Sequence, residues 1–335
     1  MTPTLRPDHD QPENPAAGGP DLDAEYRQMR EACGLLTDSG RASITVEGSE
    51  AAEFLQGQIT NEVEGLATGS GHYAVLLDRK GHIQADLRLL RLGDDEFWID
   101  ADSATAGRLV KHLNTYKIGR EVEVSRSERE VVSLIGPASP EVTGVAPGGE
   151  HDFTELTLAG ASCLTVATES GQDVIYRSGD RDAVVAELTT RGAVPISAAA
   201  AEILRVEAGR PLYGADMTEA AMPAEAGIVE RAVDFTKGCY IGQEPVARLH
   251  YRGRPNRHLR GLRLSGPVGR GDTIRNPDRE LGAVGTATVS PAYGRIGMAI
   301  LRKEAEPGDT VTVDSALGEV PAEVVELPFS RGPLE

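Results

Sequence analysis

The feature that most constrains the fold is a change of pattern close to residue 259. Beyond this point, short apolar runs are separated by Gly, Pro and Asp, which is typical of short strands joined by tight turns. The spacing predicts strands at residues 262–264, 283–289, 295–300, 310–313 and 322–325. Such a series indicates a small, separate β-barrel or sandwich.

The preceding part of the chain mixes helices and strands in uneven blocks. Helical spacing of apolar residues predicts helices at residues 22–36, 52–63, 104–113, 182–190 and 197–207. Apolar and β-branched runs predict strands at 43–46, 73–77, 83–92, 97–99, 156–166 and 173–177, with two short strands within 121–135. This uneven order favours an α+β fold over a regular βαβ series.

Length and local composition divide the chain into regions. A chain of 335 residues exceeds one typical core and suggests two or three domains. Residues 1–22 hold five prolines without apolar periodicity, so a disordered leader is expected there. Pro and Gly over 137–152 indicate a surface loop or sub-domain junction. We therefore expect an α+β region over 23–255, a β-barrel over 256–328 and a tail over 329–335.

Charge and cysteine content disfavour several classes of partner. A net charge of −18 argues against general binding to DNA, RNA or anionic membranes, which need a positive field. The longest apolar stretch, around 156–167, is too short to span a bilayer. Three widely spaced cysteines form no disulfide framework, and no apolar targeting segment stands at the N-terminus. A cytoplasmic protein is expected.

Residues 237–244, Lys-Gly-Cys-Tyr-Ile-Gly-Gln-Glu, provide a setting for a reactive thiol. Lys237 stands two residues before Cys239, and a nearby cation favours the thiolate. A helix beginning near Ile241 would add positive potential at its free N–H groups. Gly238 and Gly242 leave room for a ligand or backbone to approach. Cys239 is therefore the candidate reactive residue in this octapeptide.

The other cysteines and the metal motifs give a contrasting picture. Cys33 lies in a predicted helix and Cys163 in an apolar run, so both are expected to be small buried hydrophobes. The chain has no HExxH, no CxxC pair and no Walker loop. One well-placed cysteine does not supply the four ligands that an iron–sulfur cluster normally needs. We expect no stably bound metal.

An arginine-rich segment follows the octapeptide. Residues 245–263 contain six arginines, two histidines and no acid: Arg248, Arg252, Arg254, Arg257, Arg260, Arg263, His250 and His258. Arginines bind carboxylates and phosphates, so anion capture is one interpretation. Pairing with the acidic excess elsewhere in the chain is the other. RNA binding is disfavoured because no aromatic stacking pattern accompanies the arginines.

The octapeptide resembles the signature of the YgfZ family, folate-binding proteins that are similar to the T-protein (aminomethyltransferase) of glycine cleavage. Three further segments match in the same order: Phe54-Leu55-Gln56-Gly57-Gln58-Ile59-Thr60-Asn61, Leu77-Asp78-Arg79-Lys80-Gly81-His82-Ile83 and Met222-Pro223-Ala224-Glu225-Ala226-Gly227. The resemblance covers residues 35 to 325, approximately. It implies a T-protein-like fold, with linked α+β sub-domains around a central cavity and a C-terminal β-barrel.

The resemblance also implies a ligand, tetrahydrofolate or another reduced folate. By that resemblance Glu225 would contact the pterin, since a carboxylate accepts bonds from both a ring N–H and an amino group. Gln56 and Asn61 would line the same cavity, although Asn61 also suits a local capping role. Arg248 would bind the folate carboxylates.

Two departures separate this chain from T-proteins. Asp86 stands where T-proteins have a pair of aspartates, one of them catalytic, and Ala85 occupies the first place. In place of the Thr-Gly-Glu segment of T-proteins the chain has Arg177-Ser178-Gly179-Asp180. T-proteins also lack the octapeptide. These departures favour the YgfZ family over glycine cleavage.

Our leading hypothesis is a folate-binding, YgfZ-like protein that helps assemble or repair iron–sulfur clusters in client enzymes. Its partners would be a reduced folate and the iron–sulfur client or assembly proteins. Lys237 would keep Cys239 ionised, while Gln243 and Glu244 orient the loop and Tyr240 supports the motif. Cys239 would then ligate iron transiently, attack an electrophile or form a mixed disulfide, and the sequence leaves these open.

Two alternatives belong to other classes. One is a tetrahydrofolate-dependent one-carbon transferase that uses Asp86, which would make the protein an enzyme rather than an accessory factor. The other is a non-catalytic scaffold that binds RNA or protein through the arginine-rich segment. Client proteins, folate form and oligomeric state are left open.

Overall fold

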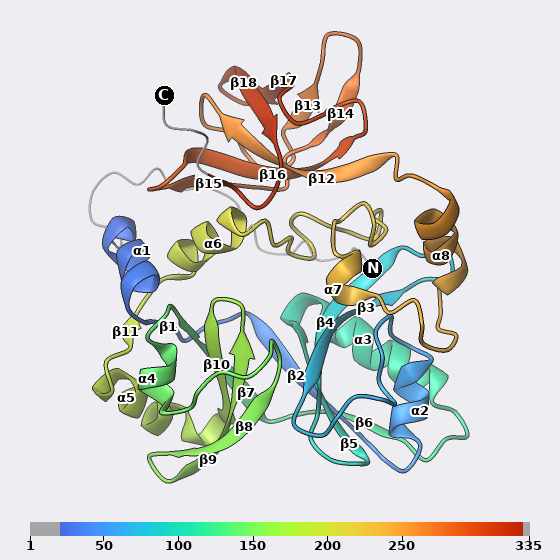
Figure 1. Cartoon of the computed structure of the whole chain (residues 1–335), viewed down its shortest axis with the longest axis vertical. Helices are drawn as coiled ribbons and strands as arrows, with labels where there is room; N and C mark the ends of the chain where they lie inside the picture. The colour runs from blue at the N-terminus through green and yellow to red at the C-terminus, as the bar shows by residue number, and fades with distance from the viewer. Residues whose placement is uncertain (1–20, 331–335) are drawn as a thin grey trace, which may run out of the picture.

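The computed structural model describes residues 21–330 as three lobes, each built on one sheet, around a common centre (Figure 1). The predicted leader and tail therefore lie outside the described residues, except at 21–22 and 329–330. Helices and strands are mixed through the first two lobes, and the third consists of strands. The α+β class and the separate C-terminal β-domain are confirmed. Within the described residues, no helix is both long and apolar enough to cross a bilayer.

The first lobe is an antiparallel sheet of five strands in the order β3-β4-β5-β2-β6. Its elements are β2 (Arg41–Glu47), α2 (Ala51–Gln56), β3 (Gly71–Leu77), β4 (Ile83–Arg91), β5 (Glu96–Asp102), α3 (Ser103–Tyr116) and β6 (Glu123–Arg126). Alternate strand residues, such as Leu87 and Leu89, meet Leu109 and Leu113 of α3 in an apolar core. The opposite residues of β4, Asp86 and Arg88, therefore face the other way.

The second lobe has six strands in the order β11-β1-β7-β10-β9-β8. Its elements are α1 (Leu22–Glu31), β1 (Gly34–Leu36), β7 (Arg129–Ile135), α4 (Ser139–Thr143), β8 (Phe153–Leu158), β9 (Ala161–Thr168), β10 (Gly171–Arg177), η1 (Ser178–Asp180), α5 (Arg181–Thr190) and β11 (Val194–Pro195). Leu90 and Trp98 of the first lobe share an apolar cluster with Val131, Val166 and Ile175 of the second. The two sheets thus pack against each other.

The third lobe is a sheet of seven strands in the order β14-β13-β17-β18-β12-β16-β15. These strands are β12 (Arg257–Leu264), β13 (Thr273–Arg275), β14 (Glu280–Ala283), β15 (Thr286–Ser290), β16 (Gly294–Arg302), β17 (Thr310–Ser315) and β18 (Gly318–Val325). Three helices lie between the second and third lobes in the chain: α6 (Ala198–Glu207), α7 (Val229–Ala232) and α8 (Gln243–Arg252). Val206 of α6 packs with Ile296 and Met298 of the third lobe.

Five predictions from the sequence need correction, and tertiary pairing explains the first. The helix predicted over 22–36 ends at Glu31, and Gly34–Leu36 is a strand paired with both β7 and β11. A Cβ at Gly34 would lie 2.8 Å from Met29 Cγ, so this approach of helix and strand depends on glycine. Helical periodicity cannot detect backbone partners that lie about 100 and 160 residues away.

The other four corrections concern the bounds and the number of the elements. The helix predicted over 52–63 stops at Gln56, after which the chain turns. The strand predicted over 156–166 is the hairpin of β8 and β9, because Ala159 and Gly160 adopt φ of 49° and 85°. The strand predicted over 283–289 is divided between β14 and β15, and the loop predicted over 137–152 contains α4.

Candidate functional site

The octapeptide begins five residues after the end of α7 and ends in the first turn of α8, and its lysine ties it to the first lobe. The Lys237 ammonium group is buried and donates to the backbone carbonyls of Ile59 and Asn61, both at 2.7 Å. It also lies 5.2 Å from the centre of the Tyr240 ring. Burial lowers the pKa of Lys237 to about 8. The lysine is thus directed at backbone oxygens, and its predicted effect on Cys239 stays a prediction.

A glycine closes the other end of the octapeptide. Gly242 caps α8 with φ of 84°, and a Cβ there would lie 2.4 Å from the carbonyl oxygen of Asp78. The amide of Ile241 donates to the carbonyl of Gly57 at 3.2 Å. The predicted start of a helix near Ile241 is confirmed, since α8 begins at Gln243. The octapeptide is therefore held between the turn at 78–82 and the segment after α2.

The three cysteines differ in exposure as expected. Cys33 and Cys163 are buried in the apolar core of the second lobe, and burial raises the pKa of both thiols, that of Cys33 to about 11. Cys239 is exposed on the octapeptide loop. Only Cys239 is therefore accessible to a partner or an electrophile in this conformation.

A second group of polar residues lies on the inner face of the first lobe, centred on Asp86. Asp86 is only 4% exposed, and its Oδ2 accepts a hydrogen bond from the Tyr73 hydroxyl at 3.1 Å. Its Oδ1 has no partner among the described residues. Burial raises the pKa of Asp86, although the charge of Arg41 opposes the shift. A buried carboxylate oxygen without a partner is rare and indicates a place for a ligand or water.

An ion-pair chain joins this face to the second lobe. Arg88 donates to Asp100 at 2.7 Å and, across the two sheets, to Asp173 at 2.6 Å. Arg41 donates to the other oxygen of Asp100 at 2.8 Å. Burial opposes ionisation of Asp100, but Arg41 and Arg88 outweigh it and lower its pKa. These ion pairs fix the position of the strands around Asp86.

More unpartnered polar groups are connected to Asp86 indirectly, through Tyr73 and Arg231. The Arg231 guanidinium lies 5.1 Å from the centre of the Tyr73 ring and pairs with Glu150. Arg231 Nε and His151 Nδ1 are buried and, like Asp86 Oδ1, lack a partner among the described residues. Burial lowers the pKa of His151 to about 4, so this ring is neutral near pH 7. Together these residues, the Asp86 cluster, offer both donors and acceptors to a polar ligand.

The predicted pterin-contacting residue occupies a different setting. Both carboxylate oxygens of Glu225 are engaged by Arg257, at 2.9 and 2.8 Å, and one also accepts from the amide of Met222 at 3.0 Å. The backbone carbonyl of Glu225 accepts from Leu259 in β12. Glu225 therefore connects the glycine- and alanine-rich loop to the third lobe, and a pterin would have to compete with Arg257 for it.

The remaining predicted ligand residues bond neighbouring protein groups. Gln56 donates to Glu62 at 2.8 Å and accepts from the amide of Val63 at 2.7 Å. Asn61 donates to the carbonyls of Tyr73 and Arg231, at 3.0 and 3.1 Å, so it links β3 to α7. Gln56 thus stabilises the loop at residues 62–63. Asn61 holds the backbone of two members of the Asp86 cluster, Tyr73 and Arg231.

Three of the six arginines in the arginine-rich segment lie close to a glutamate. Arg257 pairs with Glu225, Arg260 lies 3.7 Å from Glu326, and Arg248 pairs with Glu244 on the surface of α8. The interpretation that these arginines pair with acids therefore holds for three of the six. Arg248, predicted to bind folate, is exposed on α8.

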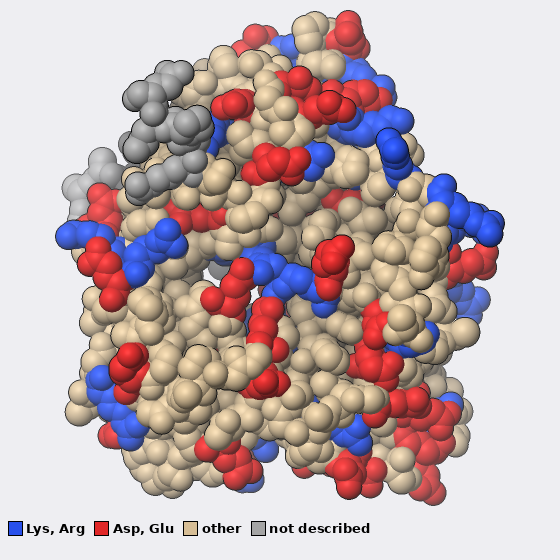
Figure 2. Space-filling view, in the orientation of Figure 1, with Lys and Arg blue, Asp and Glu red and all other residues tan. Residues whose placement is uncertain are grey.

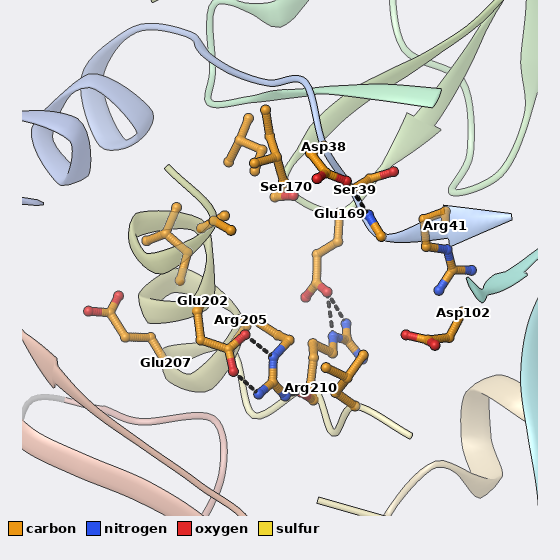
Figure 3. A pocket seen from close by; sticks show the side chains of 18 of the residues that line it. Asp38, Ser39, Arg41, Asp102, Glu169, Ser170, Glu202, Arg205, Glu207 and Arg210 are labelled. Atoms are coloured by element: carbon orange, nitrogen blue, oxygen red, sulfur yellow. Dashed lines mark hydrogen bonds and ion pairs between the residues drawn. The ribbon is translucent and has the colours of Figure 1, made fainter. Parts of the chain in front are cut away.

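A cavity of about 870 Å³ opens at the centre of the molecule beside α6. Figure 3 shows Arg41 and Asp102 on one side of it, with the pairs Glu202–Arg205 and Glu169–Arg210 on the other. Arg41 pairs in register with Asp102, and both residues act electrostatically on Asp86. None of the predicted site residues lines this cavity. The structure thus does not gather Asp86, Glu225, Arg248 and Cys239 around it.

Sequence reasoning missed most of the Asp86 cluster. Tyr73 was expected only as a strand residue, and Arg231 stands six residues before the octapeptide without a motif of its own. His151 has φ of 74°, an uncommon conformation for a residue with a side chain, but the sequence gives no sign of it. The alternation of polar residues at Asp86 and Arg88 within an apolar strand was the one available signal.

We expect Gly242→Ala to destabilise the protein, because alanine would meet the Asp78 carbonyl and adopt an unfavourable φ. The expected loss in the free energy of unfolding is about 2 kcal/mol. The matched control is Gly238→Ala in the same octapeptide, where a Cβ has no neighbour within 4 Å. Urea unfolding of both variants measures the difference, and equal midpoints would contradict the prediction.

The lowered pKa of Lys237 predicts a specific pH dependence of stability. Between about pH 8 and the ordinary lysine pKa of 10.5, the folded protein has lost a proton that the unfolded chain still holds. The unfolded state then binds more protons, so the free energy of unfolding rises with pH relative to Lys237→Met. Denaturation at pH 7.5 to 10.5 measures this, with the exposed Lys303→Met as the control. A constant difference across that range would exclude the buried-lysine explanation.

Comparison with known proteins identifies the family. Residues 18–237 match the family model described as the GCVT N-terminal domain, and residues 257–330 match the glycine cleavage T-protein C-terminal barrel domain. The chain is similar to an aminomethyltransferase of Rubrobacter xylanophilus, with 29% identity over 92% of this chain and 86% of the relative. An aminomethyltransferase of Halothermothrix orenii is 30% identical, over 91% of this chain and 90% of its own.

A solved structure agrees with these matches. The glycine cleavage system aminomethyltransferase T of Bartonella henselae superimposes with a TM-score of 0.82 at 25% identity, covering 92% of this chain and 89% of that one. The predicted relation to T-proteins is confirmed, whereas the finer YgfZ assignment stays a prediction. The chain belongs to the glycine cleavage T-protein (aminomethyltransferase) family.

Proposed function

We propose that the protein binds a reduced folate next to the Asp86 cluster and uses it as the acceptor of a one-carbon unit. The proposal rests on one observation, the buried Oδ1 of Asp86 that has no hydrogen-bond partner among the described residues. The relatives of this chain are named aminomethyltransferases, which supports a one-carbon reaction. Tetrahydrofolate is the substrate in this proposal. The amine and carbonyl groups of its ring fit a cluster that offers a carboxylate, a neutral imidazole and a guanidinium.

Asp86 has the properties that proton transfer requires. When a methylene group joins two folate amines, each amine loses its N–H proton. The carbon's bonds to the amine and to the carrier group of the aminomethyl donor both break, and these two leaving groups take up one proton each. A carboxyl group whose pKa is raised by burial accepts and returns a proton more readily near neutral pH. The Tyr73 hydroxyl holds Oδ2, which leaves Oδ1 for the substrate.

The alanine that replaces the first aspartate of the T-protein pair does not remove a group from this cluster. Ala85 is fully buried in the apolar core against α2 and α3, on the opposite face of β4. Because strand side chains alternate, only residue 86 of the pair can face the polar side. This geometry supports Asp86 as the working carboxylate of the proposal.

We expect Asp86→Asn to bind 5-formyltetrahydrofolate about tenfold more weakly or worse, since a hydrogen bond to a charged group contributes on the order of 1.5–3 kcal/mol. Titration calorimetry measures the affinity, and the exposed Asp94→Asn is the matched control. Transfer of a labelled methylene group from an aminomethyl donor to tetrahydrofolate should be lost in the same variant. Equal folate affinity in wild type and Asp86→Asn would place the folate elsewhere.

A second candidate function rests on the octapeptide. We propose that the folate-bound protein is of the YgfZ type and supports assembly or repair of iron–sulfur clusters through Cys239. The supporting observation is an exposed thiol on a loop that is fixed by Lys237 before it and Gly242 after it. A rigid, accessible cysteine suits transient iron ligation or a mixed disulfide with a client protein.

Complementation separates the two candidates. A deletion strain receives wild type, Cys239→Ala or Asp86→Asn, and several iron–sulfur enzymes and one cluster-free enzyme are assayed. If the iron–sulfur role holds, the cluster enzymes lose most of their activity on deletion and recover with wild type but not with Cys239→Ala. Recovery with both would make the thiol dispensable, and activities that never fall would leave one-carbon transfer as the function.

A further inference from the structure

We infer that the outer face of α8 and the adjoining turn at 78–82 form a docking surface for an acidic segment of another protein. We call this surface the α8 strip and define it by Arg79, Gln243, Arg248, Tyr251 and Arg252. It goes beyond both proposed functions, because its recognition chemistry requires neither folate nor iron. A partner bound there would lie next to Cys239.

The α8 strip is open and hollowed. Helix α8 buries only Val246 among its ten residues, so most of its surface faces solvent. A hollow of about 460 Å³ lies along the helix, lined by Arg248, Tyr251 and Arg252 together with Gln243 and Glu244. A second, of about 380 Å³, shares Gln243 and Glu244 and extends to Arg79 and Tyr116. The two hollows adjoin at the end of the octapeptide and give a continuous surface for an extended segment.

The charge of the strip is opposite to that of the whole chain. Arg79, Arg252 and Arg254 are exposed and have no acidic partner among residues 21–330. Arg248 pairs only with Glu244, and both side chains are more than 70% exposed, so this pair is weak and easily exchanged. Figure 2 shows positive side chains gathered along the margin of the molecule where α8 lies. In a chain of net charge −18, such a patch selects a negatively charged partner.

An aromatic platform supports the strip and favours protein over nucleic acid. Phe235 and His250 stack at 3.9 Å, and Tyr251 meets both edge-on, at 5.8 and 4.8 Å. Tyr251 is nevertheless 67% exposed, so it is a pre-positioned aromatic side chain. Tyr and Arg are the residues that most often dominate protein–protein interfaces. Phe235 and His250 stack on each other, so they do not form a series of free aromatic rings on which nucleic-acid bases could stack.

The position of Cys239 follows from the chain. Tyr240 and Ile241, which line the second hollow, directly follow Cys239. An acidic segment lying along the strip would therefore bring neighbouring groups of its protein to the exposed thiol. Docking and thiol exchange would be coupled, and that coupling can be measured.

The probe is a short peptide rich in Glu, with one Phe and one Cys held as a mixed disulfide with 5-thio-2-nitrobenzoate. The Cys239 thiolate attacks the peptide sulfur, the disulfide of the probe breaks, and the coloured thiolate leaves. A second peptide has Gln in place of every Glu. We expect the acidic peptide to react about tenfold faster at low salt, because charge steers association. The rate measured with Cys239→Ser is subtracted to correct for reaction of the probe with the two buried cysteines.

Variants of the α8 strip then show which residues cause the preference for the acidic peptide. Arg248→Glu with Arg252→Glu should reduce the rate ratio of the two peptides to near one, and Tyr251→Ala should lower it several-fold. Arg177→Glu with Arg270→Glu changes the net charge equally at exposed arginines elsewhere and should leave the ratio unchanged. A ratio near one in wild type, or equal losses in both double variants, would overturn the inference. Stronger inhibition by single-stranded RNA than by the free acidic peptide would also overturn it, in favour of a nucleic acid.

Discussion

The contact on which the rest of the structure depends is the pair of ion bridges made by Arg88. One guanidinium nitrogen meets Asp100 within the first sheet, and the other meets Asp173 in the second. Arg88 and Asp100 are buried and the Asp173 side chain is 14% exposed, so removing one partner would leave a largely buried charge uncompensated between the two sheets. The bridge therefore fixes how the two sheets face each other, while the apolar cluster of Leu90, Trp98 and Ile175 supplies the burial.

This arrangement explains why a polar cluster can exist between two packed sheets. Residues of β4 alternate between an apolar core under α3 and a polar inner face, and Asp86 and Arg88 both belong to that inner face. Arg88 has partners on two sides, whereas Asp86 keeps one oxygen free. Within three residues of one strand, Arg88 is thus fully engaged in ion pairs, whereas Asp86 keeps the oxygen on which the proposed folate site depends.

The octapeptide and the Asp86 cluster are connected by a short series of hydrogen bonds. Lys237 holds the carbonyls of Ile59 and Asn61, and the Asn61 side chain in turn holds the carbonyls of Tyr73 and Arg231. The loop that exposes Cys239 is thus anchored to Tyr73, which hydrogen-bonds Asp86, and to Arg231, which lies over the Tyr73 ring. A ligand that orders the cluster would act on the same short set of hydrogen bonds as a change in the octapeptide.

Local pattern alone determined much of this protein. The strand at 83–92, the Gly- and Pro-separated strands beyond residue 259 and the helix at 197–207 depend on neighbours in sequence, and the sequence predicted them. The octapeptide likewise identified Cys239 as the candidate reactive cysteine, and the structure shows that its thiol is exposed. Tertiary structure decided that Gly34–Leu36 is a strand, that Glu225 meets Arg257, and that Tyr73 contacts both Asp86 and Arg231. The physical reason is that these contacts join residues between 13 and 160 positions apart, or depend on how two sheets pack, and periodicity reports only the face of a single element.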